Sequence, residues 1–241
     1  MSALAPHATL ADVPDLLRGG GDNAKRWTAD WDARRIGLCV LLIGIGAGAY
    51  GAAMGAWRSP LQAGFNVIKF PLLLLATALG NALLNGMLAP LLGLNVRFRQ
   101  SLMLVLMSFA LASVILGAFA PLVAFIIWNT PPLSAARSVP WTTYNFVQLV
   151  QVTAIAFAGV AANVRLRQLL EGLAGDRKVA QKVLFAWLAG NLFLGSQLCW
   201  ILRPFIGSPT LPVEFFRPTA FQGSFYETVF HALLRVLCLI D

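Results

Sequence analysis

The sequence has few of the residues on which catalytic and metal sites depend. Asp and Glu number 10 among 241 residues, and none lies between residues 33 and 170. Histidine occurs only as His7 and His231, outside the long apolar segments. Acid–base catalysis, carboxylate metal sites and proton relays need such groups inside the protein. We therefore expect no metal, no cofactor and no enzymatic activity.

Cysteine and charge are scarce as well. The three cysteines, Cys39, Cys199 and Cys238, form no CxxC or Cys–His pair with metal-site spacing. Charged residues make up 12% of the chain and hydrophobic residues 58%, against roughly 25% and 45–50% in soluble domains. A soluble fold of this size cannot hide that much apolar surface, so lipid must surround most of the chain. The composition predicts an all-α, polytopic membrane helix bundle.

Five apolar segments are long enough to cross a hydrocarbon core of about 30 Å as helices. A polar arm, residues 1–34, precedes them, and a Pro-rich cap with a C-terminal helix, residues 203–241, follows them. The bundle itself is expected to occupy residues 35–202. The predicted spans are 36–57, 70–92, 102–128, 142–164 and 179–202.

The distribution of basic residues predicts the orientation, because cytoplasmic loops are enriched in Lys and Arg. Twelve bases lie on the side of the arm and five on the opposite side, which places the N-terminus in the cytoplasm. The net charge of +8 is explained in this way, and we expect the lipid bilayer and no nucleic acid as a partner. The twelve are Arg18, Lys25, Arg26, Arg34, Arg35, Arg97, Arg99, Arg165, Arg167, Arg177, Lys178 and Lys182; the five are Arg58, Lys69, Arg137, Arg203 and Arg217.

Both terminal segments leave alternatives open. Trp27 and Trp31 are four residues apart in the arm, which predicts an interfacial helix, with a disordered tail as the alternative. Residues 223–240 place Glu227, His231 and Arg235 within a sector of about 80° on a helix whose remaining surface is apolar. This helix either lies at the interface, the option we favour, or forms a sixth span.

Amides replace carboxylates inside the predicted spans. An unmatched amide in hydrocarbon costs several kcal/mol, so these side chains either bond one another across helices or line a water-filled space. Asn81 and Asn85, one turn apart in the second span, are assigned to helix packing. The candidates for lining a polar vestibule on the outer side are Gln148, Gln151, Gln197, Asn191 and Arg203.

Arg203 marks the start of the predicted outer cap. It follows an apolar run and precedes Pro204, so the fifth helix must end there. Its guanidinium either snorkels to phosphate headgroups or pairs with Glu214 or Glu227. The residues predicted to build the cap are Glu214, Arg217, Tyr226, Glu227 and His231.

The first span is rich in glycine. Gly44 with Gly48, and Gly51 with Gly55, are small-xxx-small pairs that let a neighbouring helix approach closely. The neighbour is either a helix of the same chain or one of another molecule. We expect self-association through this face, or association with another membrane protein.

Several short runs also carry a resemblance. They are residues 49–55 (Ala-Tyr-Gly-Ala-Ala-Met-Gly), 69–71 (Lys-Phe-Pro), 197–209 with Leu-Arg-Pro-Phe-Ile-Gly-Ser-Pro, 214–218 (Glu-Phe-Phe-Arg-Pro) and 223–226 (Gly-Ser-Phe-Tyr). Together they resemble a family of small bacterial polytopic membrane proteins, in which the last run more often reads Gly-Asn-Phe-Tyr. Members often carry a label naming an actin-binding motif, and the arm has no Leu-Lys-Lys-Thr-like segment. The layout is also similar to that of Yip-type membrane proteins; the resemblance implies the architecture and no substrate.

These features predict a non-enzymatic inner-membrane protein that forms a homo-oligomer and offers a small solute or ion a passive path or a binding site. The first alternative is an accessory or scaffold subunit of a membrane complex, in which the amides serve packing alone. The second is a lipid-modifying enzyme that uses His231 and Glu227. Because these two residues are four apart on one helix, a simple intrahelical pair is the plainer interpretation.

Overall fold

A computed structural model describes residues 32–94, 97–133, 140–174, 176–208 and 211–236. The predicted arm helix around Trp27 and Trp31 lies outside these residues. The described part is all-helical, with no strand. Its helices are α3 (Ala33–Ala56), α4 (Pro60–Leu91), α5 (Phe98–Trp128), α6 (Trp141–Ala174), α7 (Arg177–Leu202) and α8 (Phe225–Val236).

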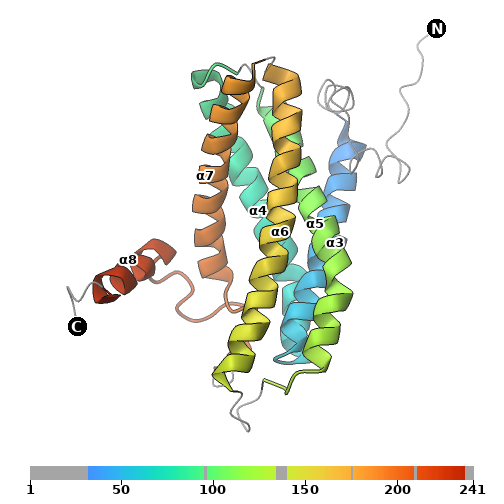
Figure 1. The fold of residues 1–241 in the computed structure, drawn as a ribbon, viewed down its shortest axis with the longest axis vertical. Coiled ribbons are helices and arrows are strands. Elements are labelled where there is room, and N and C mark those ends of the chain that lie inside the picture. Colours follow the sequence, from blue (N-terminus) through green and yellow to red (C-terminus); the bar gives the residue numbers. More distant parts are fainter. Residues whose placement is uncertain (1–31, 95–96, 134–139, 175, 209–210, 237–241) are drawn as a thin grey trace.

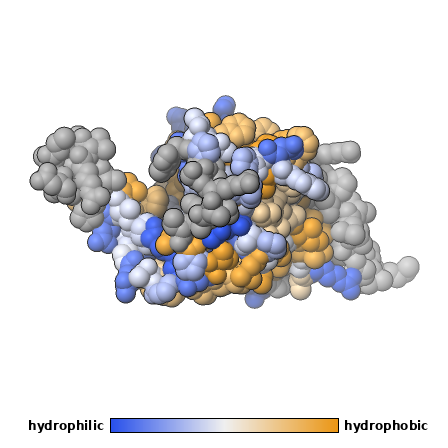
Figure 2. Space-filling view, turned by 90° about the horizontal axis from the view of Figure 1, so that it is seen from below, coloured by the Kyte–Doolittle hydropathy of each residue, from blue (hydrophilic) through white to orange (hydrophobic). Residues whose placement is uncertain are grey.

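The five long helices lie side by side along the long axis of the molecule (Figure 1). All five are long and apolar enough to cross a membrane, which confirms the predicted fold class and number of spans. We call the end at which α3, α5 and α7 finish the cap end, and the end nearer the N-terminus the arm end. Seen from below, the cap end is a mosaic of hydrophilic and apolar residues (Figure 2).

The start of α4 differs from the prediction. The helix begins at Pro60, ten residues before the predicted span, because the Ser59 hydroxyl caps it by accepting from the Gln62 amide at 3.1 Å. Lys69, which we had placed in a connecting loop, is therefore inside the helix and fully buried. Pro71 also lies inside α4 without ending it.

Helix α3 packs closely against α4 and α5, and its glycines explain why. Ideal Cβ atoms at Gly48, Gly51 and Gly55 would lie 3.3, 2.6 and 2.7 Å from atoms of α4, while one at Gly46 would lie 2.1 Å from the Ser113 carbonyl oxygen of α5. Such close backbone approach needs residues without a side chain. Only Gly44 of the two predicted pairs meets nothing within 4 Å. The glycine face is thus used within the chain, which leaves the predicted self-association without most of this surface.

Helix α8 is short and lies to the side of the bundle (Figure 1). Its 12 residues rise about 18 Å, well short of the hydrocarbon core. The described part of this segment is therefore a short sixth helix and not a span. Its N-terminus is capped by Ser224, whose hydroxyl accepts from the Glu227 amide at 3.1 Å.

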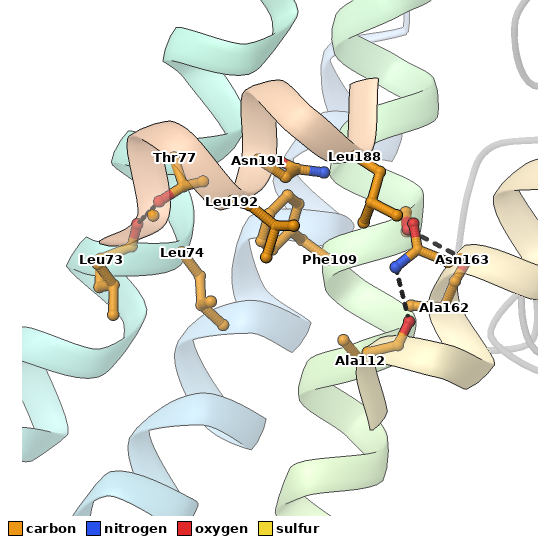
Figure 3. Close-up of a pocket in the computed structure, with 13 residues that line it drawn as sticks. Leu73, Leu74, Thr77, Phe109, Ala112, Ala162, Asn163, Leu188, Asn191 and Leu192 are labelled. Atoms are coloured by element: carbon orange, nitrogen blue, oxygen red, sulfur yellow. Dashed lines mark hydrogen bonds between the residues drawn. The ribbon is translucent and has the colours of Figure 1, made fainter. Parts of the chain in front are cut away.

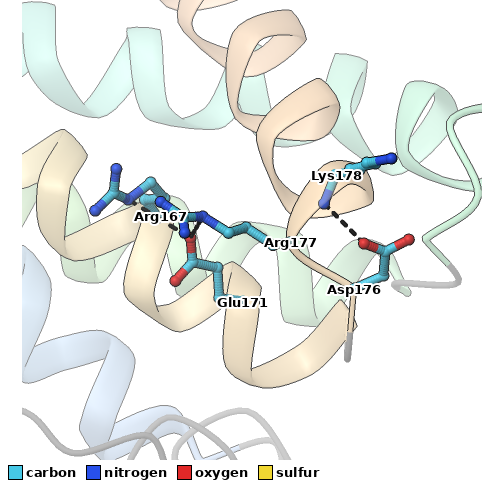
Figure 4. A network of polar contacts seen from close by, with 5 residues as sticks. All are labelled: Arg167, Glu171, Asp176, Arg177 and Lys178. Atoms are coloured by element: carbon cyan, nitrogen blue, oxygen red, sulfur yellow. Dashed lines mark hydrogen bonds and ion pairs between the residues drawn. The ribbon is translucent and has the colours of Figure 1, made fainter.

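At the arm end, ion pairs and a cap organise the turn between α6 and α7 (Figure 4). The Glu171 carboxylate lies 3.6 Å from Nε of Arg167 and 3.8 Å from Nε of Arg177. Asp176 caps α7 by accepting from the Lys178 amide at 2.8 Å. Because these ion pairs are partly exposed, each contributes at most about 1 kcal/mol.

Candidate functional site

The predicted vestibule residues lie in different environments. Gln148 is exposed on α6. Gln151, one turn further along, is buried and accepts a 2.6 Å hydrogen bond from the Tyr50 hydroxyl of α3. Gln197 accepts a 3.2 Å bond from the Phe225 amide at the start of α8. These three amides therefore do not line one space in the described part of the chain.

The Tyr50–Gln151 pair joins α3 to α6 inside the bundle. Because both side chains are buried, each polar group needs a hydrogen-bond partner within the protein, and the other residue supplies it. We expect a double-mutant cycle of Tyr50→Phe and Gln151→Leu, measured by unfolding in detergent, to give a coupling energy of about 0.6–2 kcal/mol. Strict additivity of the two single effects would contradict this pairing. The same cycle with the exposed Gln148→Leu is the control and should be additive.

A pocket opens between α4, α5, α6 and α7 about halfway along the bundle (Figure 3). Its volume is about 230 Å³, and its wall is mainly apolar. No residue of the wall has a titratable side chain. The wall consists of Leu73, Leu74, Thr77, Ser108, Phe109, Ala112, Gly159, Ala162, Asn163, Leu188, Asn191, Leu192 and Gly195.

Most polar groups of the pocket wall are already occupied by the helices themselves. The hydroxyl of Thr77 donates to the Leu73 carbonyl at 2.7 Å, and that of Ser108 to the Ala162 carbonyl at 3.3 Å. The amide nitrogen of Asn163 donates to the Gly159 carbonyl at 2.9 Å. Asn163 is not among the predicted site residues. An amide within the apolar run of the predicted fourth span was the signal that could have identified it.

Asn191 is the exception in this wall. Its side-chain oxygen accepts a 2.7 Å hydrogen bond from the amide nitrogen of Asn81 on α4. Its own amide nitrogen has no partner among the described residues and points away from α4, towards the side of the pocket that Asn163 lines (Figure 3). The Asn81 bond thus holds Asn191 in place with its donors directed at the pocket.

Further towards the arm end, α4 and α7 bury more polar groups. Asn85 is fully buried, and both its side-chain nitrogen and oxygen lack a partner in the described structure. The indole nitrogen of Trp187 is likewise buried without a partner. The assignment of Asn81 to helix packing agrees with its bonds to Asn191 and to the Trp187 carbonyl, whereas Asn85 forms no such bond.

At the cap end, α4 holds the chain that leaves α7. Gln62 donates to the Pro204 carbonyl at 2.8 Å, and Asn66 donates to the Phe205 carbonyl at 2.7 Å. Both amides are fully buried. Sequence reasoning missed them because it started the second span at residue 70; the spacing of residues 62, 66 and 69 on one helix face was the available signal.

The connection between α3 and α4 contributes to the same end. Trp57 donates from its indole to the Pro131 carbonyl at 2.9 Å, and Arg58 donates to the Leu133 carbonyl at 3.2 Å. Gly207 has a positive φ of 94°, and an added Cβ would lie 2.9 Å from the Arg58 side chain. Glycine is needed there both for the backbone conformation and for the contact.

The predicted cap residues have the following contacts. The Glu214 carbonyl accepts from the Lys69 ammonium at 3.2 Å, Arg217 donates to the Trp200 carbonyl at 3.4 Å, and Tyr226 donates to the Phe193 carbonyl at 2.5 Å. The His231 side chain lies outside the described residues. Arg203 stacks on Trp200, an arrangement in which the aromatic ring attracts the guanidinium. The predicted choice between a headgroup contact and an ion pair for Arg203 stays a prediction.

No family model, curated protein or solved structure matches this chain.

Proposed function

We propose that this protein is a non-enzymatic integral membrane protein that binds a small, mainly apolar molecule carrying one hydrogen-bond acceptor. The observation that carries the proposal is the Asn191 amide, which Asn81 holds with its free donors directed at the apolar pocket. An apolar pocket with a few convergent polar groups is the usual form of a small-molecule site. Binding is favoured over a passive path, because the amides expected to line that path are bonded or exposed elsewhere.

The lack of titratable groups in the pocket wall supports a binding role over catalysis. A bound molecule there would meet hydrocarbon side chains, helix carbonyls that already accept, and the donors of Asn191. A ketone, ester or ether oxygen would complement those donors. We also propose, from the distribution of basic residues, that the arm end faces the cytoplasm.

Photolabelling with benzophenone tests the proposal, since this probe is apolar, has one ketone acceptor and inserts into nearby C–H bonds on illumination. In the full-length protein in detergent, we expect labelled peptides to cover residues 159–163 and 188–195. Asn191→Leu should reduce this labelling about 2- to 12-fold, which corresponds to one neutral hydrogen bond of about 0.5–1.5 kcal/mol. Peptide mass spectrometry gives the site and the yield.

A pocket-filling variant and a matched control complete the experiment. Gly159 lines the pocket, and an added Cβ there meets nothing within 4 Å, so Gly159→Leu should fill the space and abolish the label. Gly37→Leu, at an equally open position of α3, should leave labelling unchanged. Equal labelling in the wild-type protein and Gly159→Leu, spread over the lipid-facing helices, would contradict the proposal.

A second candidate, an accessory or scaffold subunit, is favoured by one observation. In the most apolar 18-residue stretch of α7, only 6% of the residues are buried, compared with 50% in the corresponding stretch of α3. Phe185 of α7 is 73% exposed, and Phe193 is 59% exposed even with Tyr226 of α8 stacked on it. This face contacts either lipid or a helix of another protein. Affinity purification in mild detergent that yields one other membrane protein in fixed stoichiometry, lost on Phe185→Ser, would favour the scaffold role.

A further inference from the structure

Three cationic side chains lie at the cap end, away from the pocket. Lys69 comes from α4, Arg203 is the residue that ends α7, and Arg217 comes from the chain that follows. Arg203 and Arg217 both face Trp200, with guanidinium carbons 3.0 and 5.9 Å from the centre of its ring. Arg217 lies within electrostatic reach of both other cations. We call these three residues the basic cluster.

In the part of the chain that the structure describes, no carboxylate forms an ion pair with the basic cluster. The ion pairs of the described residues involve Asp32 and Glu171, both at the arm end. Glu214 is the acidic residue nearest to Arg217 in the sequence. It accepts the hydrogen bond from Lys69 with its backbone carbonyl and not with its carboxylate. Bringing three like charges together without a counter-charge is unfavourable, and more so where water is excluded.

Burial raises the free-energy cost of these unpaired positive charges. Lys69 is fully buried, with its ammonium 5.2 Å from the ring centre of Phe215 and 5.9 Å from that of Phe65. The Nε atoms of Arg203 and Arg217 are both buried without a hydrogen-bond partner. Burial lowers the pKa of Arg203, the charge of Arg217 lowers it further, and Cys199 raises it. Two guanidinium groups and an ammonium thus keep donors that the described chain does not use.

We propose that the basic cluster binds a phosphate group. Arginine presents a planar fork of donors that matches phosphate oxygens in pairs, and a lysine adds a compact positive charge. Trp200 holds the Arg203 guanidinium in a fixed plane, and the Lys69 ammonium is positioned by the Glu214 carbonyl. A phosphate held by the two guanidinium groups, which are only partly buried, neutralises the cluster, and the buried Lys69 adds its charge to the attraction. The phosphate belongs either to the headgroup of an anionic lipid or to a soluble phosphate ester.

The phosphate site is independent of the proposed pocket function. It lies at the cap end, uses charge instead of a neutral amide, and shares no residue with the pocket wall. Failure of benzophenone labelling would leave it unaffected, and the reverse also holds.

Thermal unfolding of the full-length protein in an uncharged maltoside detergent tests this inference. One arm adds phosphatidylglycerol, with zwitterionic phosphatidylcholine as its control; the other adds inorganic phosphate, with sodium chloride at equal ionic strength as its control. A ligand that binds the folded state raises the unfolding temperature. We expect a rise with phosphatidylglycerol, with inorganic phosphate or with both, and none with either control. A rise with the lipid alone assigns the phosphate to a headgroup, and a rise with inorganic phosphate assigns it to a soluble ester.

Variants connect the effect to the basic cluster. Arg203→Gln should raise the apparent Kd for phosphate at least about tenfold, since a hydrogen bond to a charged group contributes more to binding than a neutral one. Arg203→Lys keeps the charge but loses the fork, so it should give an intermediate Kd. Lys178→Gln removes one exposed charge at the arm end and should bind as the wild-type protein does. Absence of any phosphate-dependent rise, an equal rise with the controls, or an unchanged Kd in both Arg203 variants would overturn the proposal.

Discussion

Gly46→Ala should destabilise the protein by about 1–3 kcal/mol or more, whereas Gly44→Ala, two residues earlier on the same helix, should not. The new methyl group at position 46 would lie 2.1 Å from the Ser113 carbonyl oxygen, and backbone there cannot move unless α3 and α5 separate. At position 44 the methyl group meets nothing within 4 Å. Alanine in a helix is favoured over glycine by about 1 kcal/mol, so Gly44→Ala should be neutral or stabilising.

Unfolding of both purified variants in mixed detergent micelles measures this difference. The pair is matched in residue type, helix and size of change, so only the surroundings of the methyl group differ. Equal stability of the two variants would show that α3 and α5 do not cross at Gly46. The crossing involves a second glycine, because an added Cβ at Gly117 of α5 would lie 2.9 Å from the Gly46 Cα.

Asn66→Leu is the second change with a large expected effect. It removes the hydrogen bond that the Asn66 amide nitrogen donates to the Phe205 carbonyl. It also removes the Asn66 oxygen that accepts from the side-chain nitrogen of Gln62. An unsatisfied buried polar group costs about 1–3 kcal/mol, so we expect a loss of at least that size. Because Asn66 also helps hold the chain after α7, limited proteolysis should cut the cap of the variant faster.

The exposed Asn145→Leu at the start of α6 is the control for this prediction. It makes the same chemical change on a neighbouring helix without a buried partner. If Asn66→Leu were as stable and as protease-resistant as Asn145→Leu, the Asn66–Phe205 bond would not hold the cap.

Apolar length alone was sufficient to predict the five long helices. Helix ends were less predictable, because Lys69 and Pro71 in an apolar run look like the edge of a span. The structure keeps both inside α4, since the Lys69 ammonium contacts the Glu214 carbonyl, 145 residues away, and the neighbouring Phe215 ring. Such a partner cannot be identified from local sequence.

The candidate site was predictable only in part for the same reason. Asn191 was expected to matter, but its direction depends on Asn81, which is 110 residues away. Gln151 looked like a free amide in a vestibule until Tyr50, 101 residues away, was found bonded to it. The glycine pairs of α3 predicted close packing correctly, whereas the identity of the packing helix was a matter of tertiary structure.

One mechanical consequence follows from the way in which α8 is attached. Tyr226 stacks on Phe193 at 5.0 Å between ring centres and donates to its carbonyl, and Gln197 accepts from the first amide of α8. Phe193 and Gln197 alternate along α7 with Asn191 and Gly195, which line the pocket. The side helix α8 and one wall of the pocket are therefore both attached to α7. If α7 tilts when a ligand occupies the pocket, linkage requires the reverse effect as well: a displacement of α8 that tilts α7 changes the affinity of the pocket for that ligand.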